Sequence, residues 1–450
     1  MMHTTHFGAC LVAFAALGAC GGPVTGDVYD PVIDDVSPHQ GDYGTTVTVR
    51  GTHLENSAII AHSPDGEVVT LLPAVDPNAA KASADPKAPP DPPLTFRFPF
   101  PAEGEMTLTG HRFDVSLGAF TPTWAPGQPA RLDGQRVLGA VALGGDTAVL
   151  VDGPRGASFV VFGAGAPRTF AVAASPMDVT SATLRVVGTK VEALLAGKAG
   201  FALATFDGTT ASAQSYAPVD GALLGVGADD QGFVVVARTT DDKIARLRGA
   251  PPMLVQVGAS VPVPGTVSAG KGVLAVSGNG TVVHGWSGAA GNFLDDVASF
   301  SMAGLAPTAD DFGSTESLGS LDDVFKNIDV EVKGGVVHLS YCAVDTGLFS
   351  APTDRCGSAA TVDGVMRLDV SGATSGDGAV SLAAGKLSVA TCDEHDVMVI
   401  RSGIPGAAAG VGEPSIYPCT SATVHAIASD DAGTRIVVEQ ANKIWVTRRR

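Results

Sequence analysis

Basic residues are scarce in this chain of 450 residues. Lys and Arg together number 28 against 46 Asp and Glu, which gives a formal net charge of −18. A field of that sign repels polyanions, so the composition predicts that the partner is not a nucleic acid and not another polyanion. Charged residues make up only 16% and hydrophobic residues 45%, a balance that excludes a solvated, disordered chain.

Aromatic residues and catalytic signatures are also few. Phe, Tyr and Trp make up 6%, with Trp only at positions 124, 286 and 445, so no broad aromatic platform for sugars is expected. No GxGxxG follows a strand, and no HExxH or GxSxG occurs. The segment 265–272 nearly fits a P-loop, but Gly272 stands where a Ser or Thr must hold Mg²⁺. The sequence therefore identifies no cofactor, no metal site and no catalytic residue.

Long apolar runs are missing from the body of the chain. The most apolar later stretch, 184–206, is interrupted by Arg185, Lys190, Glu192 and Lys198, which is incompatible with a membrane-spanning helix. Turn-forming residues are abundant instead, with 56 Gly and 29 Pro. This composition favours strands and turns, and the length favours two or three domains. We predict an all-β protein.

The first nineteen residues predict a signal peptide. Phe7 to Ala19 reads FGACLVAFAALGA, which is too short to cross a bilayer core of about 30 Å but suits the apolar region of a secretory signal. The run ends in Leu17-Gly18-Ala19-Cys20, which resembles the lipobox of bacterial lipoprotein precursors. The resemblance implies cleavage before Cys20 and lipidation of that residue.

Two further features concern the predicted cellular location. Residue 21 is Gly and not the Asp that retains many lipoproteins at the inner membrane, so the resemblance implies an outer-membrane lipoprotein that faces the periplasm or the cell surface. Residues 1–6 contain no Lys or Arg, which departs from the usual signal. A plain secretory signal cleaved near Ala19, or a buried apolar strand, stays the alternative.

Four cysteines remain once Cys10 is removed with the signal and Cys20 is acylated. They are Cys342, Cys356, Cys392 and Cys419. An even number in an exported chain predicts two disulfides. Three connectivities are possible, and we favour Cys342 with Cys356 and Cys392 with Cys419 because these pairs close short loops. The alternative, a metal site on the segment 392–396 (CDEHD), lacks the ligand spacing of zinc sites.

Residues 31–122 show the pattern of a small β-domain after a short tether, 20–30. The stretch 31–54 reads PVIDDVSPHQGDYGTTVTVRGTHL, in which Val47 and Val49 alternate with polar residues as in a half-buried strand. Further strands are expected at 58–62, 67–72, 95–100 and 105–110, with a solvated loop at 73–93. The PxI strand, the SPxxG turn and the Gly-Thr before the alternating strand resemble the IPT/TIG family. That resemblance implies an immunoglobulin-like sandwich, which bacteria use as a spacer or a recognition unit on surface proteins.

The remainder of the chain, 123–450, repeats a strand, a glycine turn and an apolar strand. The turns are anchored at Gly145, Gly188, Gly232, Gly272, Gly335, Gly385 and Gly433. The anchors lie 40 to 50 residues apart, except for 63 between Gly272 and Gly335. A period of roughly 40 to 50 residues is typical of β-propeller blades, so we predict seven blades. An acidic insertion at 307–327 explains the long interval. We expect a solvated loop there, although its segment 308–323 could hold Ca²⁺.

The last unit shows only three strands, at 424–429, 435–439 and 444–447. A ring closes best when an N-terminal segment supplies the missing strand, and we expect residues 115–135 to do so. The alternative architecture is a string of small β-sandwiches.

These features favour a non-enzymatic envelope or cell-surface lipoprotein. It would hold the membrane by its N-terminal lipid and present a propeller on an Ig-like spacer to an envelope protein or glycan. Two alternatives stay open: a polysaccharide hydrolase or lyase acting at the mouth of the propeller, and a structural protein of envelope assembly.

Overall fold

The computed structural model describes the chain from residue 30 to residue 449. The segments outside the description are 42–43, 55–56, 65, 67, 72–92, 100–101, 111–112, 174, 176–178, 198–199, 230, 251–252, 264–272, 278–279, 290–295, 304–315, 322, 334–335, 346–352, 363–364, 373–377, 384–385, 393–396, 404–414, 419–422 and 431–432. The described residues form strands and turns, so the predicted all-β class is confirmed. Among them no helix is long and apolar enough to cross a membrane.

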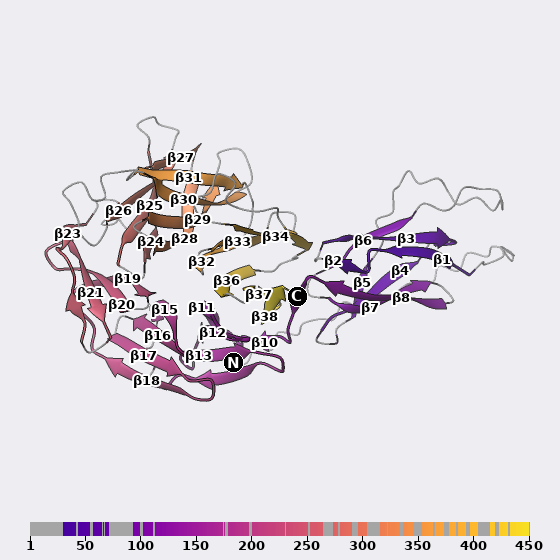
Figure 1. Ribbon diagram of the computed structural model, residues 1–450, viewed down its shortest axis with the longest axis horizontal. Helices are drawn as coiled ribbons and strands as arrows, with labels where there is room; N and C mark the ends of the chain where they lie inside the picture. The colour runs from indigo at the N-terminus through magenta and orange to yellow at the C-terminus, as the bar shows by residue number, and fades with distance from the viewer. Residues whose placement is uncertain are drawn as a thin grey trace, which may run out of the picture.

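Two sheets built from residues 32–122 enclose one core (Figure 1). The first sheet has the order β1 (Val32–Ser37), β3 (Thr46–Thr52), β6 (Leu94–Arg97). The second has the order β2 (Gln40–Gly41), β8 (Phe113–Pro122), β7 (Gly104–Gly110), β4 (Ala58–His62), β5 (Val68–Leu71). Val47 and Val49 are fully buried between exposed or half-buried neighbours, as their alternation predicts. The predicted loop at 73–93 falls almost entirely outside the described residues.

Six further sheets are each formed mainly from successive strands. The first is β11 (Arg136–Leu143), β12 (Asp146–Asp152), β13 (Ser158–Phe162), β14 (Arg168–Ala171). The second is β15 (Val179–Val187), β16 (Lys190–Gly197), β17 (Gly200–Phe206), β18 (Ala211–Tyr216). The third is β19 (Ala222–Asp229), β20 (Gly232–Arg238), β21 (Lys243–Gly249), β22 (Val255–Gln256), with β23 (Val261–Pro262) also on β21.

The next three sheets follow the same order. The fourth is β24 (Val273–Val276), β25 (Val282–Ala289), β26 (Asp296–Ala303), β27 (Glu316–Leu321). The fifth is β28 (Asp323–Lys333), β29 (Val336–Asp345), β30 (Thr353–Val362), β31 (Val365–Gly372). The sixth is β32 (Gly378–Ala383), β33 (Lys386–Cys392), β34 (Val397–Gly403), β35 (Ser415–Pro418).

The closing sheet joins the two ends of the repeating region. β36 (Thr423–Asp430), β37 (Gly433–Gln440) and β38 (Lys443–Arg449) pair in order, and β38 also pairs with β9 (Trp124–Pro126) and β10 (Ala130–Arg131). The prediction that residues 115–135 supply the missing strand is therefore confirmed, although they supply two short strands and their first part belongs to β8.

The first strands of the sheets form a closed circuit in the described part of the chain. Contacts run from β11 to β15, β19, β24, β28, β32 and β36, and from β36 back to β11. Figure 1 shows the yellow β36–β38 between the sixth sheet and the first. Side chains of one sheet pack on the next, as in the cluster that joins Leu150 and Phe159 of the first sheet to Leu195 and Phe206 of the second.

The ring has two faces, which we name by their connections. On the turn face, the first strand of a sheet passes to the second, as at the described turns Gly144–Gly145 and 188–189. On the start face, the first strands begin and the second strands pass to the third. Gly188, Gly232 and Gly433 adopt positive φ at turn-face turns, as the repeat predicts.

Two predictions along the repeat are wrong. Gly272 is not the turn of the fourth sheet, because β24 begins directly after it and the turn before β25 contains Gly280, with φ of 91°. The acidic segment 308–323 is also not all loop: Glu316–Leu321 forms β27, which pairs with β26, and Asp323 opens β28.

Arginine side chains link neighbouring sheets. At the closing seam, Arg435 Nη2 donates to Gly144 O at 2.8 Å, and Arg448 donates to Gly145 O at 2.8 Å and to Phe162 O at 2.7 Å. Burial, and then the nearby charge of Arg435, lowers the pKa of Arg448. These carbonyls lie in the first sheet, so the bonds hold the last sheet to it.

Bonds from an arginine to a backbone carbonyl of the next sheet also occur between the first and second, second and third, and third and fourth sheets. Arg136 of the first sheet donates to Val179 O of the second. Arg185 of the second donates to Asp229 O of the third at 3.0 Å, and its guanidinium stacks 4.7 Å from the ring centroid of Phe233. Arg246 of the third donates to Gly280 O at 2.8 Å. A guanidinium bonded to a carbonyl across a junction fixes both distance and direction.

We expect Arg435→Met to weaken ring closure. The side chain is 6% exposed and pairs with Asp430 at 3.0 Å, so its loss leaves a partly buried carboxylate and a carbonyl without their donor. The free energy of unfolding should fall by about 2–3 kcal/mol, measured by urea denaturation. Arg168→Met is the control, because the Arg168–Asp146 pair at 3.8 Å is half exposed and should cost less than about 1 kcal/mol. Equal losses would contradict a role for Arg435 at the seam.

Candidate functional site

Polar groups on the turn face are used within the ring. Ion pairs there join Arg185 to Glu192 at 2.6 Å, Arg248 to Asp229 at 2.9 Å and Arg435 to Asp430 at 3.0 Å. The same arginines or their neighbours also bond to carbonyls of adjacent sheets. The turn face therefore serves to hold the sheets together.

The start face carries a repeated irregularity. In five of the first strands the register with the second strand shifts by one residue close to the start face. The extra residues are Leu138, Thr180, Leu224, Lys326 and His425. Such bulges redirect side chains and are common at barrel rims and beside functional sites.

His425 departs from the chemistry of its counterparts. Leu138 and Leu224 pack into apolar clusters between sheets. His425 Nε2 instead lies 2.5 Å from Glu439 Oε2, with both side chains partly exposed at 24% and 30%. The second and fifth sheets also place polar residues, Thr180 and Lys326, at this position, and what distinguishes His425 is its bond to a carboxylate of the neighbouring strand.

Basic residues also stand at the start face of the closing and first sheets. Arg131 ends β10 and lies directly opposite Lys443 of β38. Arg136 opens β11, lies opposite Asp152 and pairs with it at 3.4 Å. Arg155 lies in the turn between β12 and β13 and is exposed.

The turns that carry these residues are tightly bonded. Leu132 N donates to Asn442 O at 3.1 Å, and Gln135 N donates to Leu132 O at 2.8 Å. Asp133 and Gly134 between them adopt positive φ of 48° and 79°. A Cβ at Gly153 would lie 2.6 Å from Gln135 Cγ, so the turn holding Arg155 rests directly on the turn holding Arg136. We call Arg131, Arg136, Asp152, Arg155, His425, Glu439 and Lys443 the start-face site.

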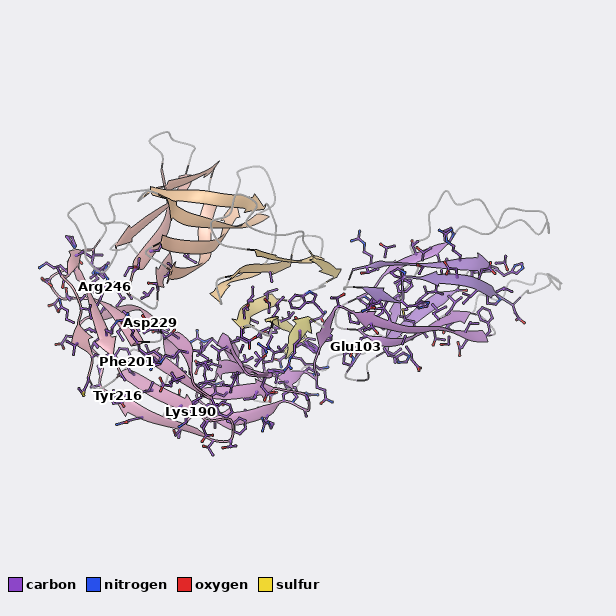
Figure 2. All side chains as sticks on the ribbon, viewed as in Figure 1. Glu103, Lys190, Phe201, Tyr216, Asp229 and Arg246 are labelled. Atoms are coloured by element: carbon purple, nitrogen blue, oxygen red, sulfur yellow. The ribbon has the colours of Figure 1, made fainter. Side chains whose placement is uncertain are left out.

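The sandwich-like first unit joins the ring away from this site. β9 pairs with the last residues of β38, Thr447–Arg449, at the turn face, whereas Lys443 begins β38 at the start face. Glu103 lies at the end of the first unit that adjoins the ring (Figure 2). The start face is thus left open by the junction.

The carboxylates with lowered pKa values lie outside the start-face site. Hydrogen bonds from Thr210 and then Thr209 hold the pKa of Asp207 far below its usual range, in an exposed turn between β17 and β18. Hydrogen bonds from Lys243 and Thr239 lower the pKa of Asp241 in the turn before β21. Both carboxylates cap their own turns. Among the described residues, no group of three or more His, Cys, Asp or Glu side chains could hold a metal ion.

The structure reaches only some of the residues singled out in the sequence. Cys20, Cys419 and the segment 265–272 lie outside the described residues, and so does most of the segment 392–396. Cys342 of β29 and Cys356 of β30 are direct partners in the antiparallel register. Opposed residues in such a pair have Cα atoms about 4.5–5.5 Å apart, within the range of a disulfide. Cys392 ends β33.

The start-face site was not predicted from the sequence. His425 and Arg131 stand in ordinary strand segments, and the pairing that places Arg131 opposite Lys443 joins residues about 300 positions apart. A bulge leaves no mark in the sequence. The available signal was the basic segment RLDGQR at 131–136 in an acidic chain.

Comparison with known proteins concerns the fold. No family model matches the chain, and no curated protein matches it. Similar solved structures include a Bacteroides thetaiotaomicron protein of unknown function, at 10% identity and a TM-score of 0.35 over 94% of this chain and 99% of that one. A polysaccharide lyase, Uly1, matches at 8% identity and a TM-score of 0.42. The match covers 69% of this chain and 89% of the lyase chain.

Two further neighbours extend the comparison. The β-propeller domain of Myceliophteria thermophila Cps50 (Swd1) matches at 11% identity and a TM-score of 0.37 over 70% of this chain and 99% of that one. YCF48 bound to a D1 peptide matches at 10% identity and a TM-score of 0.41. The match covers 72% of this chain and 94% of the YCF48 chain. The described chain is all-β, and one of these neighbours is a β-propeller domain.

The register predicts a cross-strand disulfide between Cys342 and Cys356. Peptide mapping of the unreduced, alkylated protein by mass spectrometry should recover the two peptides linked. Cys342→Ser with Cys356→Ser should lower the free energy of unfolding by about 3 kcal/mol, because the link closes a short loop in the unfolded chain. Alkylation of both thiols without a reductant would contradict the pairing.

Proposed function

We propose that this protein is a lipid-anchored, non-enzymatic envelope protein that presents a seven-bladed β-propeller on an Ig-like spacer of the IPT/TIG type. Its domains would be the signal 1–19, the tether 20–30, the spacer 31–122 and the propeller 123–450. Cys20 would carry the lipid, and the propeller would bind an envelope protein or glycan. The observation that carries this proposal is the direction of the first strand.

The chain enters the spacer at the end remote from the ring. β2 pairs with the last residues of β8, and Thr123 N donates to Gly41 O at 2.7 Å, so residues 40–41 lie at the junction. β1 runs toward them and begins at Val32, at the far end (Figure 1). The 10 residues of β8 span about 33 Å from that end to the junction. A lipid attached before Val32 would therefore be held away from the ring by the length of the spacer.

The junction between spacer and ring is short and packed. Only Thr123 separates β8 from β9, and Gly127 N donates to Val446 O at 3.2 Å. Trp124 is 5% exposed. It belongs to one contiguous apolar cluster that contains Phe120 and Val47 of the spacer as well as Val438 and Trp445 of the closing sheet. The spacer would accordingly orient the ring, and not merely tether it.

An enzymatic role is the second candidate, and the observation that favours it is the His425–Glu439 pair. A carboxylate bonded to an imidazole can orient it for proton transfer, and the pair lies at the start-face end of an inner strand. The start-face site contains no further arrangement that identifies a reaction. Turnover of an envelope polysaccharide that is lost in His425→Gln would establish this candidate over the first.

Surface exposure and anchoring are tested together on intact cells. Protease treatment followed by mass spectrometry should remove the ring peptides of the wild type, and the Cys20→Ala variant should leave the membrane fraction. Retention of the variant in the membrane would contradict lipidation at Cys20. Protection of the wild type until the outer membrane is opened would place the ring in the periplasm and direct the search for a partner there.

Trp124→Ala should uncouple the spacer from the ring. Loss of the indole opens a cavity in the shared cluster, at a cost of about 3–5 kcal/mol. Hydrogen exchange should show faster exchange of the Thr123 and Gly127 amides, and small-angle X-ray scattering should show a broader distribution of shapes. Val32→Ala, at a side chain 55% exposed at the far end, is the control. Unchanged exchange at the junction in Trp124→Ala would argue against a rigid spacer.

A further inference from the structure

The outermost strand of the second sheet, β18 (Ala211–Tyr216), is an open sheet edge. It pairs with β17 on one side, and in the described part of the chain no strand pairs with its other side. Figure 1 shows β18 on the outer rim of the ring, away from the first unit. We propose that this edge pairs with β18 of a second copy of the chain, so that two rings join through one continuous antiparallel sheet.

The other described outer strands of the ring carry features that discourage edge pairing. Natural edge strands are protected by short length, charged side chains, proline or bulges. Six of the outer strands have only two to four residues, namely β9, β10, β14, β22, β23 and β35. β27 and β31 are longer, but both contain charged residues and shift register against the strand beside them.

The strand β18 lacks each of these protective features. It has six residues in unbroken register with β17, from Phe201 opposite Tyr216 to Phe206 opposite Ala211 (Phe201 and Tyr216 are labelled in Figure 2). Its sequence, ASAQSY, contains no charged residue and no proline. In a ring whose other described edges are protected, an exposed, regular and uncharged edge indicates a partner strand.

The register decides which backbone groups of β18 point outward. The two-residue turn 208–209 joins β17 to β18, and Asp207 N donates to Thr210 O at 3.2 Å, so these two residues form a hydrogen-bonded pair. Bonded and non-bonded pairs alternate along an antiparallel ladder. Ala211 and Ala213 therefore belong to non-bonded pairs with β17 and direct their N–H and C=O groups to the open side.

An antiparallel second copy centred on Ala213 uses these outward groups. Ala213 then lies opposite its own copy, where its small side chain permits close approach of the two strands. Ser212 and Gln214, both exposed, lie opposite each other on either side of the twofold axis, where hydroxyl and amide groups can form hydrogen bonds. No like charges meet, although each chain carries a net charge of −18. The strand is thus complementary to itself, which favours a second copy as its partner.

The length of the edge sets the expected strength of pairing. Six residues on each side bury less than the roughly 1,200–2,000 Å² of a stable interface. We therefore expect a reversible monomer–dimer equilibrium with a dissociation constant in the micromolar range.

Sedimentation velocity combined with hydrogen exchange tests the pairing. The sample is the chain 21–450, which lacks only the predicted signal and the residue expected to carry the lipid. Over about 1–200 µM it should convert from monomer to dimer. Exchange of the Ala211 and Ala213 amides should slow at least tenfold as the dimer forms. The Ser212 and Gln214 amides already point toward β17 and are the internal control. A monomer at all concentrations, or a dimer without selective protection of the two alanine amides, would overturn the proposal.

Two charge variants test the register of the second copy. Ser212→Lys with Gln214→Lys places like charges opposite each other on both sides of the axis and should weaken dimerisation at least tenfold. The matched variant, Ser212→Lys with Gln214→Glu, has complementary charges at the same positions and should dimerise at least as tightly as the wild type. Both positions are exposed, and an unchanged melting temperature checks that each variant is folded.

The outcomes separate self-pairing from other uses of the edge. Equal loss of dimer in both variants, or no loss in the double lysine variant, would overturn the register centred on Ala213. Protection of the Ala211 and Ala213 amides by an envelope extract, at concentrations where the pure chain is monomeric, would assign the edge to another protein and overturn the second copy as its partner.

Discussion

The bond between an arginine and a carbonyl of the next sheet is the interaction on which the ring depends. Twisted sheets packed face to face leave their tight turns as the points of closest approach, and those turns expose backbone oxygens. Arg435, Arg185 and Arg246 each donate to such an oxygen across a junction. Because a guanidinium is planar and permanently charged, it fixes the angle between two sheets as well as their contact. Apolar packing fills the junctions but does not by itself set that angle.

The arginine bonds occur at both faces, because Arg136 donates to Val179 O at the start face and Arg185, Arg246 and Arg435 donate near the turn face. The turn face also receives the first unit through β9. The start face keeps its bulges, its histidine pair and its exposed cations. In a protein with few basic residues, Arg136, Arg185, Arg246, Arg435 and Arg448 are used to bond across the junctions. Scarcity makes their positions informative.

The sequence predicted what local patterns determine. The alternation at Val47 and Val49 located a strand and its buried face, and glycine turns located most of the repeat. The turn of the fourth sheet was predicted at Gly272 because the sequence does not tell whether the turn precedes or follows a short apolar run. That choice depends on which strand β24 pairs with, and β24 pairs with β25. His425, Arg131 and the arginine bonds depend on register and on contacts between distant segments. Neither the strand register nor a contact between distant segments produces a periodic pattern in the sequence.

The closing sheet also dictates the order in which the fold can be completed. The strands of the spacer are all present once the chain has been made as far as Pro122, but β9 and β10 have no partner until β38 exists, some 300 residues later. During synthesis the first unit can therefore finish folding while the ring stays open, with the edges of its terminal sheets exposed. The ring is closed by its last strand, so any delay or truncation before Lys443 leaves a folded first unit joined to an unclosed ring.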